Sequence, residues 1–244
     1  RRPANASQPA LSSEAFLRHR NKPVHQKIDD PKKLIKRWEK PVRIFWLWGL
    51  EQIGSNMTVV EYENDILIID AGMEFADDSM PGVDYIILDI SYLMAKKKNI
   101  KGLIITHGHV DHIWAVKYII SNLDYPTIYT SPLTIGMIKR NLDDKDAKNL
   151  KYKLVDPDID VFKLGIFTLE FFRVNHSIPE AMWVSVHTPK GLLVFSGDFK
   201  IDFTPAIDKP ADLGKISRIG QEGVKMYLWE STNANKPWHS VSEK

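Results

Sequence analysis

The stretch His107-Gly108-His109-Val110-Asp111-His112 places four potential metal ligands within six residues. It follows Ile100 to Thr106, an apolar run of the length of a buried strand. Beyond it, apolar residues recur at the spacing of one helix face, at Ile113, Val116, Ile120 and Leu123. The sequence therefore predicts a ligand-bearing loop between a buried strand and an amphipathic helix.

The residue types in this loop suit a divalent transition metal. The chain has no cysteine, so thiolate metal sites and disulfides are excluded. Histidine with aspartate suits Zn²⁺ or Mn²⁺. In an extended segment His107 and His109 point the same way, and Asp111 and His112 face a second metal once the chain turns into the helix. A lone histidine is usually structural, but three with an aspartate at this spacing are hard to explain structurally.

Other acidic and histidine residues stand at strand ends in the same way. Asp70, His176 and Asp198 each lie at or just beyond the end of a predicted strand. These strands are Asp65–Asp70, Phe167–Val174 and Leu192–Ser196. Strand ends and the loops beyond them are where an α/β scaffold presents its chemistry. We therefore expect His176 and Asp198 to converge with His107 and His109 on one metal.

The charge of the chain is unevenly distributed. Its 244 residues carry a net charge of +2, but residues 1–40 contain 11 Lys and Arg against 4 Asp and Glu. We predict that segment 1–40 is a flexible basic arm, which either holds phosphate backbones by charge or is a solvated tail without a partner. No apolar run is long enough to span a bilayer, and this segment lacks a signal-peptide core. The expected location is the cytoplasm.

Six further segments indicate which family of proteins with such a histidine-rich loop the chain resembles. His107 to His112 matches the signature of the metallo-β-lactamase superfamily, and from about Val42 onward the chain resembles the ribonuclease J family, a member of the β-CASP group of nucleases. The segments that carry the resemblance are Gly54-Ser55-Asn56-Met57, Pro81-Gly82-Val83-Asp84, Asp89-Ile90-Ser91-Tyr92-Leu93, Val174-Asn175-His176-Ser177-Ile178-Pro179, Gly197-Asp198-Phe199-Lys200 and Glu230-Ser231-Thr232-Asn233. The resemblance implies an α/β (α+β) fold, the four-layer αββα sandwich, over residues 41–235, with the start of a β-CASP insertion at 236–244.

The resemblance also implies a role for each matching residue. His107, His109 and His176 would bind a first zinc ion, Asp111 and His112 a second, and Asp198 would bridge the two. Asp70 would orient a ligand imidazole by a hydrogen bond. Glu230 would contribute to proton transfer, which makes Asp70, Asp111, Asp198 and Glu230 the implied catalytic carboxylates. Ser231, Thr232 and Asn233 would contact an RNA phosphate.

The implied activity is metal-dependent cleavage of RNA in RNA processing or decay, either 5′-to-3′ exonucleolytic or endonucleolytic. Two zinc ions would be bound in a complete site, with manganese as the alternative metal. RNA is the expected partner, no membrane is expected, and a homo-oligomer of the full-length protein is left open.

The chain departs from the family in where it ends. It stops at Lys244, before the rest of the insertion and before the histidines that follow it in the family, one of which is the last ligand of the second zinc. His239 comes too soon after Glu230 to replace either. We therefore expect an incomplete fold at the C-terminus, an under-liganded second site and poor catalysis by residues 1–244.

Tryptophan is the second departure. Trp48, Trp114, Trp183 and Trp238 stand where the family has glycine, and Trp229 where it has a small residue. Because glycine serves positive φ or close backbone approach, we expect such backbone at Trp48 and Trp114. One hypothesis is that UGA codons, read as glycine in the source organism, were translated as tryptophan. The alternative is a genuine aromatic set around which the protein has repacked.

Two other functions stay open. The first is a small hydrolase of the same fold acting on an ester or lactam, which would need a histidine ligand after Asp198, where only His239 is available. The second is a non-catalytic RNA-binding module that uses the basic arm. Salt-dependent RNA binding without metal-dependent cleavage would favour the binding module.

Overall fold

A computed structural model of the chain describes residues 40–50, 54–76, 78–237 and 241–242. The basic arm, apart from Lys40, lies outside the described residues, as do Trp238 and His239. Residues 40–244 form one compact unit by their internal contacts, and it is this unit whose described part carries the fold. None of the helices in this described part is both long and apolar enough to cross a membrane.

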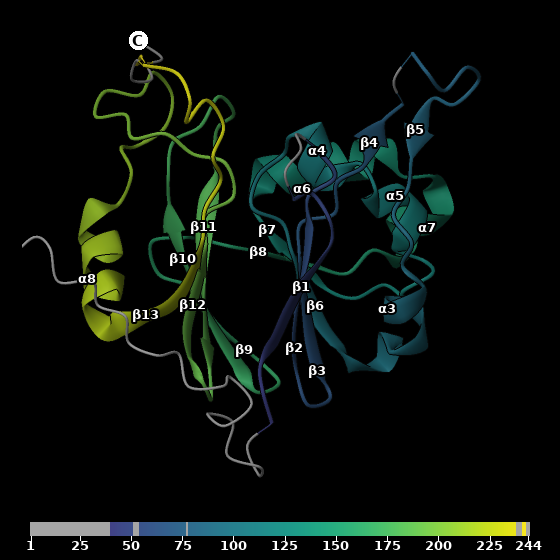
Figure 1. Cartoon of the computed structure of the whole chain (residues 1–244), viewed down its shortest axis with the longest axis horizontal. Helices are drawn as coiled ribbons and strands as arrows, with labels where there is room; N and C mark the ends of the chain where they lie inside the picture. The colour runs from purple at the N-terminus through teal and green to yellow at the C-terminus, as the bar shows by residue number, and fades with distance from the viewer. Residues whose placement is uncertain (1–39, 51–53, 77, 238–240, 243–244) are drawn as a thin grey trace, which may run out of the picture. The chain divides into compact units, whose positions relative to one another are not determined.

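Two β-sheets form the centre of this unit (Figure 1). The first sheet has the strand order β1-β2-β3-β6-β7-β8 and the second the order β13-β12-β11-β10-β9. The strands of the first sheet are β1 (Arg43–Trp48), β2 (Met57–Tyr62), β3 (Asp65–Ile69), β6 (Ile100–Ile104), β7 (Ile128–Thr130) and β8 (Tyr152–Leu154). Those of the second are β9 (Val161–Leu164), β10 (Phe167–Arg173), β11 (Met182–Thr188), β12 (Gly191–Phe195) and β13 (Val224–Leu228). A short hairpin, β4 (Glu74–Phe75) and β5 (Tyr85–Ile86), stands apart from both sheets.

Helices cover the outer face of each sheet, which gives the four layers expected of an αββα sandwich (Figure 1). The helices over the first sheet are α3 (Ser91–Ala95), α4 (Val110–Ile113), α5 (Val116–Ile119), α6 (Pro132–Asn141) and α7 (Asp144–Asn149), with the 3₁₀ turn η1 (Lys97–Asn99). Helix α8 (Leu213–Gly223) covers the second sheet. The predicted αββα sandwich is confirmed in these described layers.

Three apolar clusters fill the spaces between the layers. Leu67 and Ile104 of the first sheet pack with Phe171 and Val184 of the second. Ile66 and Ile68, which alternate with Leu67 along β3, instead face the helical layer. A third cluster around Phe172 and Ile219 joins the second sheet to α8. The period-2 alternation of β3 thus divides one strand between two cores.

The helix predicted after His112 is interrupted, which corrects the sequence-based expectation of one continuous helix. It consists of α4 and α5, separated at Trp114 and Ala115. Ala115 N donates to Ala71 O (2.9 Å) rather than to the carbonyl four residues before it. The carbonyls of Asp111 and His112 accept from Asn56 N (3.1 Å) and Ala71 N (2.8 Å). The break occurs because neighbouring turns capture the backbone groups that a continuous helix would pair internally.

Of the two backbone features expected at the unusual tryptophans, positive φ or close backbone approach, the first is not found at Trp48 or Trp114. Neither Trp48 nor Trp114 is among the described residues with positive φ, and Trp114 has φ −73°. The position that does demand glycine nearby is Gly72, where an added Cβ would lie 1.7 Å from Asp111 O. Gly72 therefore allows the turn after β3 to press against the metal-ligand loop.

Candidate metal centre

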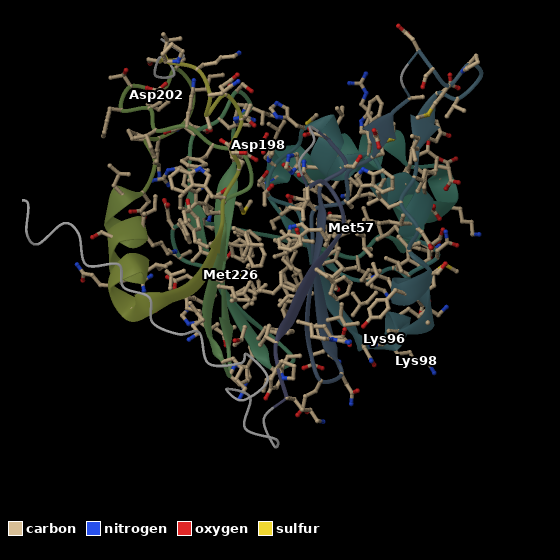
Figure 2. The ribbon with its side chains drawn as sticks, in the orientation of Figure 1. Met57, Lys96, Lys98, Asp198, Asp202 and Met226 are labelled. Carbon is tan, nitrogen blue, oxygen red and sulfur yellow. The ribbon has the colours of Figure 1, made fainter. Side chains whose placement is uncertain are left out.

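The six predicted metal ligands gather at one end of the two sheets. His107 and His109 follow β6, Asp111 and His112 lie in α4, His176 follows β10, and Asp198 follows β12. Figure 2 labels Asp198 at this end, whereas Lys96 and Lys98 lie at the opposite end of the unit. Three strand ends therefore bring residues from three parts of the chain to one place.

Three histidines and Asp198 form a first ligand group. The ligand atoms of His107, His109, His176 and Asp198 all lie within 4.8 Å of one another. His109 Nδ1 lies 3.1 Å from His107 Nε2 and 3.0 Å from His176 Nε2. Ligands placed tetrahedrally at zinc's usual distance are about 3.3 Å apart. The spacing of these nitrogens therefore fits one small divalent ion.

Asp111, His112 and Asp198 form a second group, again with ligand atoms within 4.8 Å. His112 Nε2 lies 3.5 Å from Asp111 Oδ2 and 3.5 Å from Asp198 Oδ1. The other oxygen of Asp198, Oδ2, lies 3.7 Å from His176 Nε2. One carboxylate thus presents a different oxygen to each group, an arrangement that can bridge two ions.

Asp70 and Thr106 contact the ligand histidines on the side away from the ligand groups. Asp70 Oδ2 lies 2.8 Å from His112 Nδ1. Asp70 Oδ1 accepts hydrogen bonds from Thr106 N (2.8 Å) and Thr106 Oγ1 (3.1 Å). Thr106 Oγ1 in turn lies 3.0 Å from His107 Nδ1. Both imidazoles therefore have a polar partner on the ring nitrogen that faces away from the ligand groups.

The histidines of the first group have lowered pKa values, which favours binding of a metal ion over binding of protons. Burial, together with the neighbouring His112, His176 and His109, lowers the pKa of His107 well below its ordinary value. Burial also lowers the pKa of His109 and of His176, although nearby carboxylates oppose this. Because these imidazoles are neutral around pH 7, their nitrogen lone pairs are available to a cation.

His112 has the opposite shift. Its burial lowers the pKa, but the charge of Asp70 and hydrogen bonds to Asp111 and Asp198 outweigh burial and raise it well above the ordinary value. Asp111 is the complement: burial raises its pKa, yet the hydrogen bond and charge of His112 lower it overall. In the second group, a proton on His112 therefore neutralises carboxylate charge that a metal would otherwise neutralise.

A cleft of about 720 Å³ opens on the second group. Its lining includes Asp111, His112 and Asp198, together with Glu230 and the exposed segment 231–233. Glu230 is half-buried, and its Oε2 accepts from Thr232 N (2.6 Å). The residues predicted for proton transfer and RNA contact thus share one cleft with the second group.

Asn56 and Thr106 belong to the site although sequence reasoning gave them no role. Asn56 Nδ2 lies 3.1 Å from His112 Nε2 and 3.3 Å from Asp111 Oδ2. Both residues were visible in the sequence, Asn56 within a family-like segment and Thr106 directly before His107. Their contacts depend on the pairing of β2 and β6 with opposite edges of β3, which no local pattern encodes.

The sequence of the chain is similar to a protein family and to individual known proteins. Residues 50–218 match the family model described as the metallo-beta-lactamase superfamily. The chain is 40% identical over 216 residues to ribonuclease J of Mycoplasma pneumoniae, covering 88% of this chain and 37% of that protein. It is 37% identical over 211 residues to ribonuclease J 2 of Staphylococcus aureus strain MRSA252, covering 86% of this chain and 38% of that protein. The chain thus spans just over a third of the length of these relatives.

One solved structure shares the fold at low sequence identity. The crystal structure of a protein of unknown function from Enterococcus faecalis V583 aligns with a TM-score of 0.54 and 16% identity. The alignment covers 83% of this chain and 52% of that chain. At this identity the likeness concerns the fold alone.

Proposed function

This chain belongs to the metallo-β-lactamase superfamily, and on that premise we propose that it is the metal-binding part of a zinc-dependent ribonuclease that acts in RNA processing or decay in the cytoplasm. The observation that carries the proposal is the pair of ligand groups that share Asp198 and open on one cleft. The relatives named ribonuclease J supply the substrate class.

The donor sets support a two-metal site. Three imidazole nitrogens and one carboxylate suit zinc in the first group. The second group has one imidazole and two carboxylates, which zinc or manganese would accept. Two bound ions would supply Lewis acidity, lowering the pKa of water and neutralising phosphate charge.

Residues of the chain would orient the ligands, bridge the two groups, transfer a proton and contact the RNA. Asp70 holds His112 in the orientation that presents Nε2 to the second group. Asp198 connects the two groups through its two oxygens. Glu230, on the wall of the cleft, is positioned to hold or move a proton. Ser231, Thr232 and Asn233 offer hydroxyl and amide groups to an RNA phosphate in that cleft.

Cleavage of 5′-labelled single-stranded RNA tests the proposal. We expect residues 1–244 to cleave poorly, and a chain continued beyond Lys244 to the length of the relatives to cleave well. A chelator and Asp198→Asn should each abolish cleavage by the longer chain, whereas Lys98→Gln, at the opposite end, should not. The ladder of labelled products distinguishes exonucleolytic from endonucleolytic cleavage.

Three results would contradict the proposal or the expectation that later residues are needed. Cleavage by the longer chain that survives both the chelator and Asp198→Asn would exclude a metal-dependent reaction at this site. Salt-dependent RNA binding by the longer chain without chelator-sensitive cleavage would favour a binding module. Strong, chelator-sensitive cleavage by residues 1–244 would overturn the expectation that later residues are needed.

A further inference from the structure

Thr106 lies just beyond β6, directly before the ligand His107, and it is only 1% exposed. Each polar group of this threonine has a partner. Its N–H donates to Asp70 Oδ1 (2.8 Å), and its carbonyl oxygen accepts from Met182 N (3.1 Å) at the start of β11. Its hydroxyl contacts both Asp70 and His107. Thr106 therefore connects a strand end of the first sheet to the second sheet and to a metal-ligand imidazole.

The side chain of Thr106 is also held by packing against Gly197. Gly197 has φ +54°, and a Cβ added to it would lie 2.8 Å from Thr106 Oγ1 and 2.9 Å from Thr106 Cβ. The threonine thus fills the space that a side chain at position 197 would need. Gly197 directly precedes Asp198, which belongs to both ligand groups. Packing and hydrogen bonds together therefore fix the position of the Thr106 hydroxyl.

The single hydrogen of that hydroxyl decides the direction of two hydrogen bonds. Thr106 Oγ1 lies 3.1 Å from Asp70 Oδ1, 3.0 Å from Asp70 Oδ2 and 3.0 Å from His107 Nδ1. A carboxylate offers only lone pairs, so a hydroxyl that did not donate to Asp70 would face two electron-rich oxygens with no hydrogen between them. When the hydroxyl donates to Asp70, its oxygen can only accept from His107, which requires a hydrogen on Nδ1.

A hydrogen on Nδ1 leaves the free lone pair of His107 on Nε2. Nε2 is the atom that faces the first ligand group, 3.1 Å from His109 Nδ1. A histidine binds metal through the ring nitrogen that carries no hydrogen, and the partner of the other nitrogen determines which one that is. The contacts of Thr106 therefore favour the form of His107 that can bind a metal.

We propose that Thr106 is a positioning residue for the first ligand group: its hydroxyl donates to Asp70 and accepts from Nδ1–H of His107, which presents Nε2 to a metal ion. The proposal rests on the proposed metal site. Asp70 then acts on both groups, because it contacts His112 directly and His107 through the hydroxyl. Loss of the hydroxyl should weaken metal binding in the first group, whereas His112 in the second group keeps its contact with Asp70.

Nitrogen-15 NMR of the histidine rings in residues 1–244, kept metal-free by a chelator, tests the direction of these hydrogen bonds without a substitution in Thr106. The shifts of the two ring nitrogens show which one carries the hydrogen, and His107→Gln identifies the signals of His107 by their loss. We expect the hydrogen on Nδ1 of His107. A hydrogen on Nε2 would overturn the proposal, because the hydroxyl would then donate to His107 instead of to Asp70.

Calorimetric titration of residues 1–244 with Zn²⁺ tests the effect on metal binding. Thr106→Val replaces the hydroxyl with a methyl group of similar size, and we expect it to weaken binding in the first group about 10–100-fold, the range typical for a residue that orients a ligand. Thr106→Ser keeps the hydroxyl and should bind Zn²⁺ nearly as tightly as the parent chain. His176→Ala removes a ligand found only in the first group, so it identifies the binding event of that group.

Thr130→Val is the matched control for Thr106→Val. Thr130 is fully buried in the neighbouring strand β7, and its hydroxyl donates to a backbone carbonyl, Ile105 O (3.0 Å), rather than to a residue of the site. This variant loses a buried hydroxyl in the same sheet. It should nevertheless bind Zn²⁺ like the parent chain and keep the hydrogen on Nδ1 of His107.

Two titration results would overturn the proposal. Parent-like Zn²⁺ binding by Thr106→Val would show that the hydroxyl does not position His107. Equal weakening by Thr106→Val and Thr130→Val would show that the effect comes from the fold and not from the contact with the imidazole. Neither the NMR measurement nor the titration involves RNA, so a failure of RNA cleavage would count against the proposed function alone.

Discussion

Asp70 Oδ2 lies 2.8 Å from His112 Nδ1, while the other carboxylate oxygen of Asp70 accepts from Thr106 N at 2.8 Å. Asp70 directly follows β3, and Thr106 follows β6, the parallel neighbour of β3. One buried carboxylate therefore joins the two strand ends and holds a metal-ligand imidazole. Asp70 has φ 61°, an uncommon conformation for a residue other than glycine, and its three hydrogen-bond partners hold it there.

We predict that Asp70→Asn weakens metal binding in the second group about 10–100-fold, the range typical for a residue that orients a ligand. The amide has nearly the shape of the carboxylate but lacks the charge that favours the Nδ1–H form of His112. The first group should change less, because His107 has Thr106 as its partner. Titration with Zn²⁺ measures both events.

Asp84→Asn is the control for Asp70→Asn, since Asp84 is an exposed aspartate in the hairpin segment before β5. It should bind both ions like the parent chain. If Asp70→Asn also bound both ions like the parent, the contact with His112 would have no part in setting the metal affinity.

The opposite pKa shifts of the histidines predict different pH dependences for the two groups. His112 has a raised pKa, so around neutral pH a metal must displace its proton. His107 has a lowered pKa and carries no proton to displace. Affinity in the second group should therefore rise with pH from 6 to 8, with release of a proton, whereas affinity in the first should change little above pH 6.5. Titrations in buffers of different ionisation enthalpy count the protons, and equal proton release in both events would refute this.

The same pKa shifts determine whether the stability of the metal-free protein rises or falls with pH. The contribution of His112 is fully present below about pH 6.5, its unfolded value, and is lost as pH rises through its raised pKa. His107 acts in the opposite direction: its lowered pKa costs stability as pH falls below about 6.5, where the unfolded chain binds the proton more readily. His112→Gln should remove the loss on the alkaline side while leaving the loss on the acid side, as measured by urea unfolding without metal.

Structural features of this protein can be predicted from its sequence when they depend on residues that are close together in the chain. The strands β2 and β13 are short runs that contain β-branched and aromatic residues, and the helix α6 follows from capping: Ser131 caps α6 through Thr134 N, with Pro132 at its first position. The ligand-bearing loop was likewise recognisable from six consecutive residues. These features depend on contacts within one turn or one strand.

The features that sequence analysis missed depend on distant partners. β8 has three exposed residues and no buried face, and it is a strand because β7 offers it a parallel edge. The break between α4 and α5 requires Ala71 to accept from Ala115 N. Asn56 and His112 are 56 residues apart in the sequence. They come into contact only when β2 has paired with β3. Such contacts have no local signature.

Trp183 has a measurable defect that its sequence position alone does not reveal. Its side chain is buried in β11 among Phe172, Phe199 and Tyr227, and its indole Nε1 is a buried donor without a hydrogen-bond partner in the described structure. An unpaired buried donor costs about 1–3 kcal/mol. Trp183→Phe keeps an aromatic ring and removes this donor, at about 1 kcal/mol for the smaller volume.

We therefore expect Trp183→Phe to raise the free energy of unfolding by about 1 kcal/mol, or the melting temperature by about 2–4 °C in a chain of this size. Trp46→Phe is the matched control, because its half-buried indole is not an orphaned donor and its truncation relieves nothing. A less stable Trp183→Phe would mean that packing of the larger ring outweighs its unpaired N–H.

The origin of the unusual tryptophans can be determined from the gene, and one of them, Trp183, carries a structural cost. Trp183 bears the cost expected of a large residue placed where the family has glycine, whereas Trp48 and Trp114 lie in backbone that any residue can adopt. A misread codon acts on every glycine encoded by UGA, whatever its backbone, so this uneven cost is compatible with the hypothesis. Genuine adaptation would instead favour positions where an indole packs and hydrogen-bonds. If UGA was misread, the gene carries UGA at codons 48, 114, 183 and 238 and UGG at codons 38 and 46. Sequencing the gene decides, because UGG at all six codons would establish that the tryptophans are genuine and that the chain tolerates the unpaired Trp183.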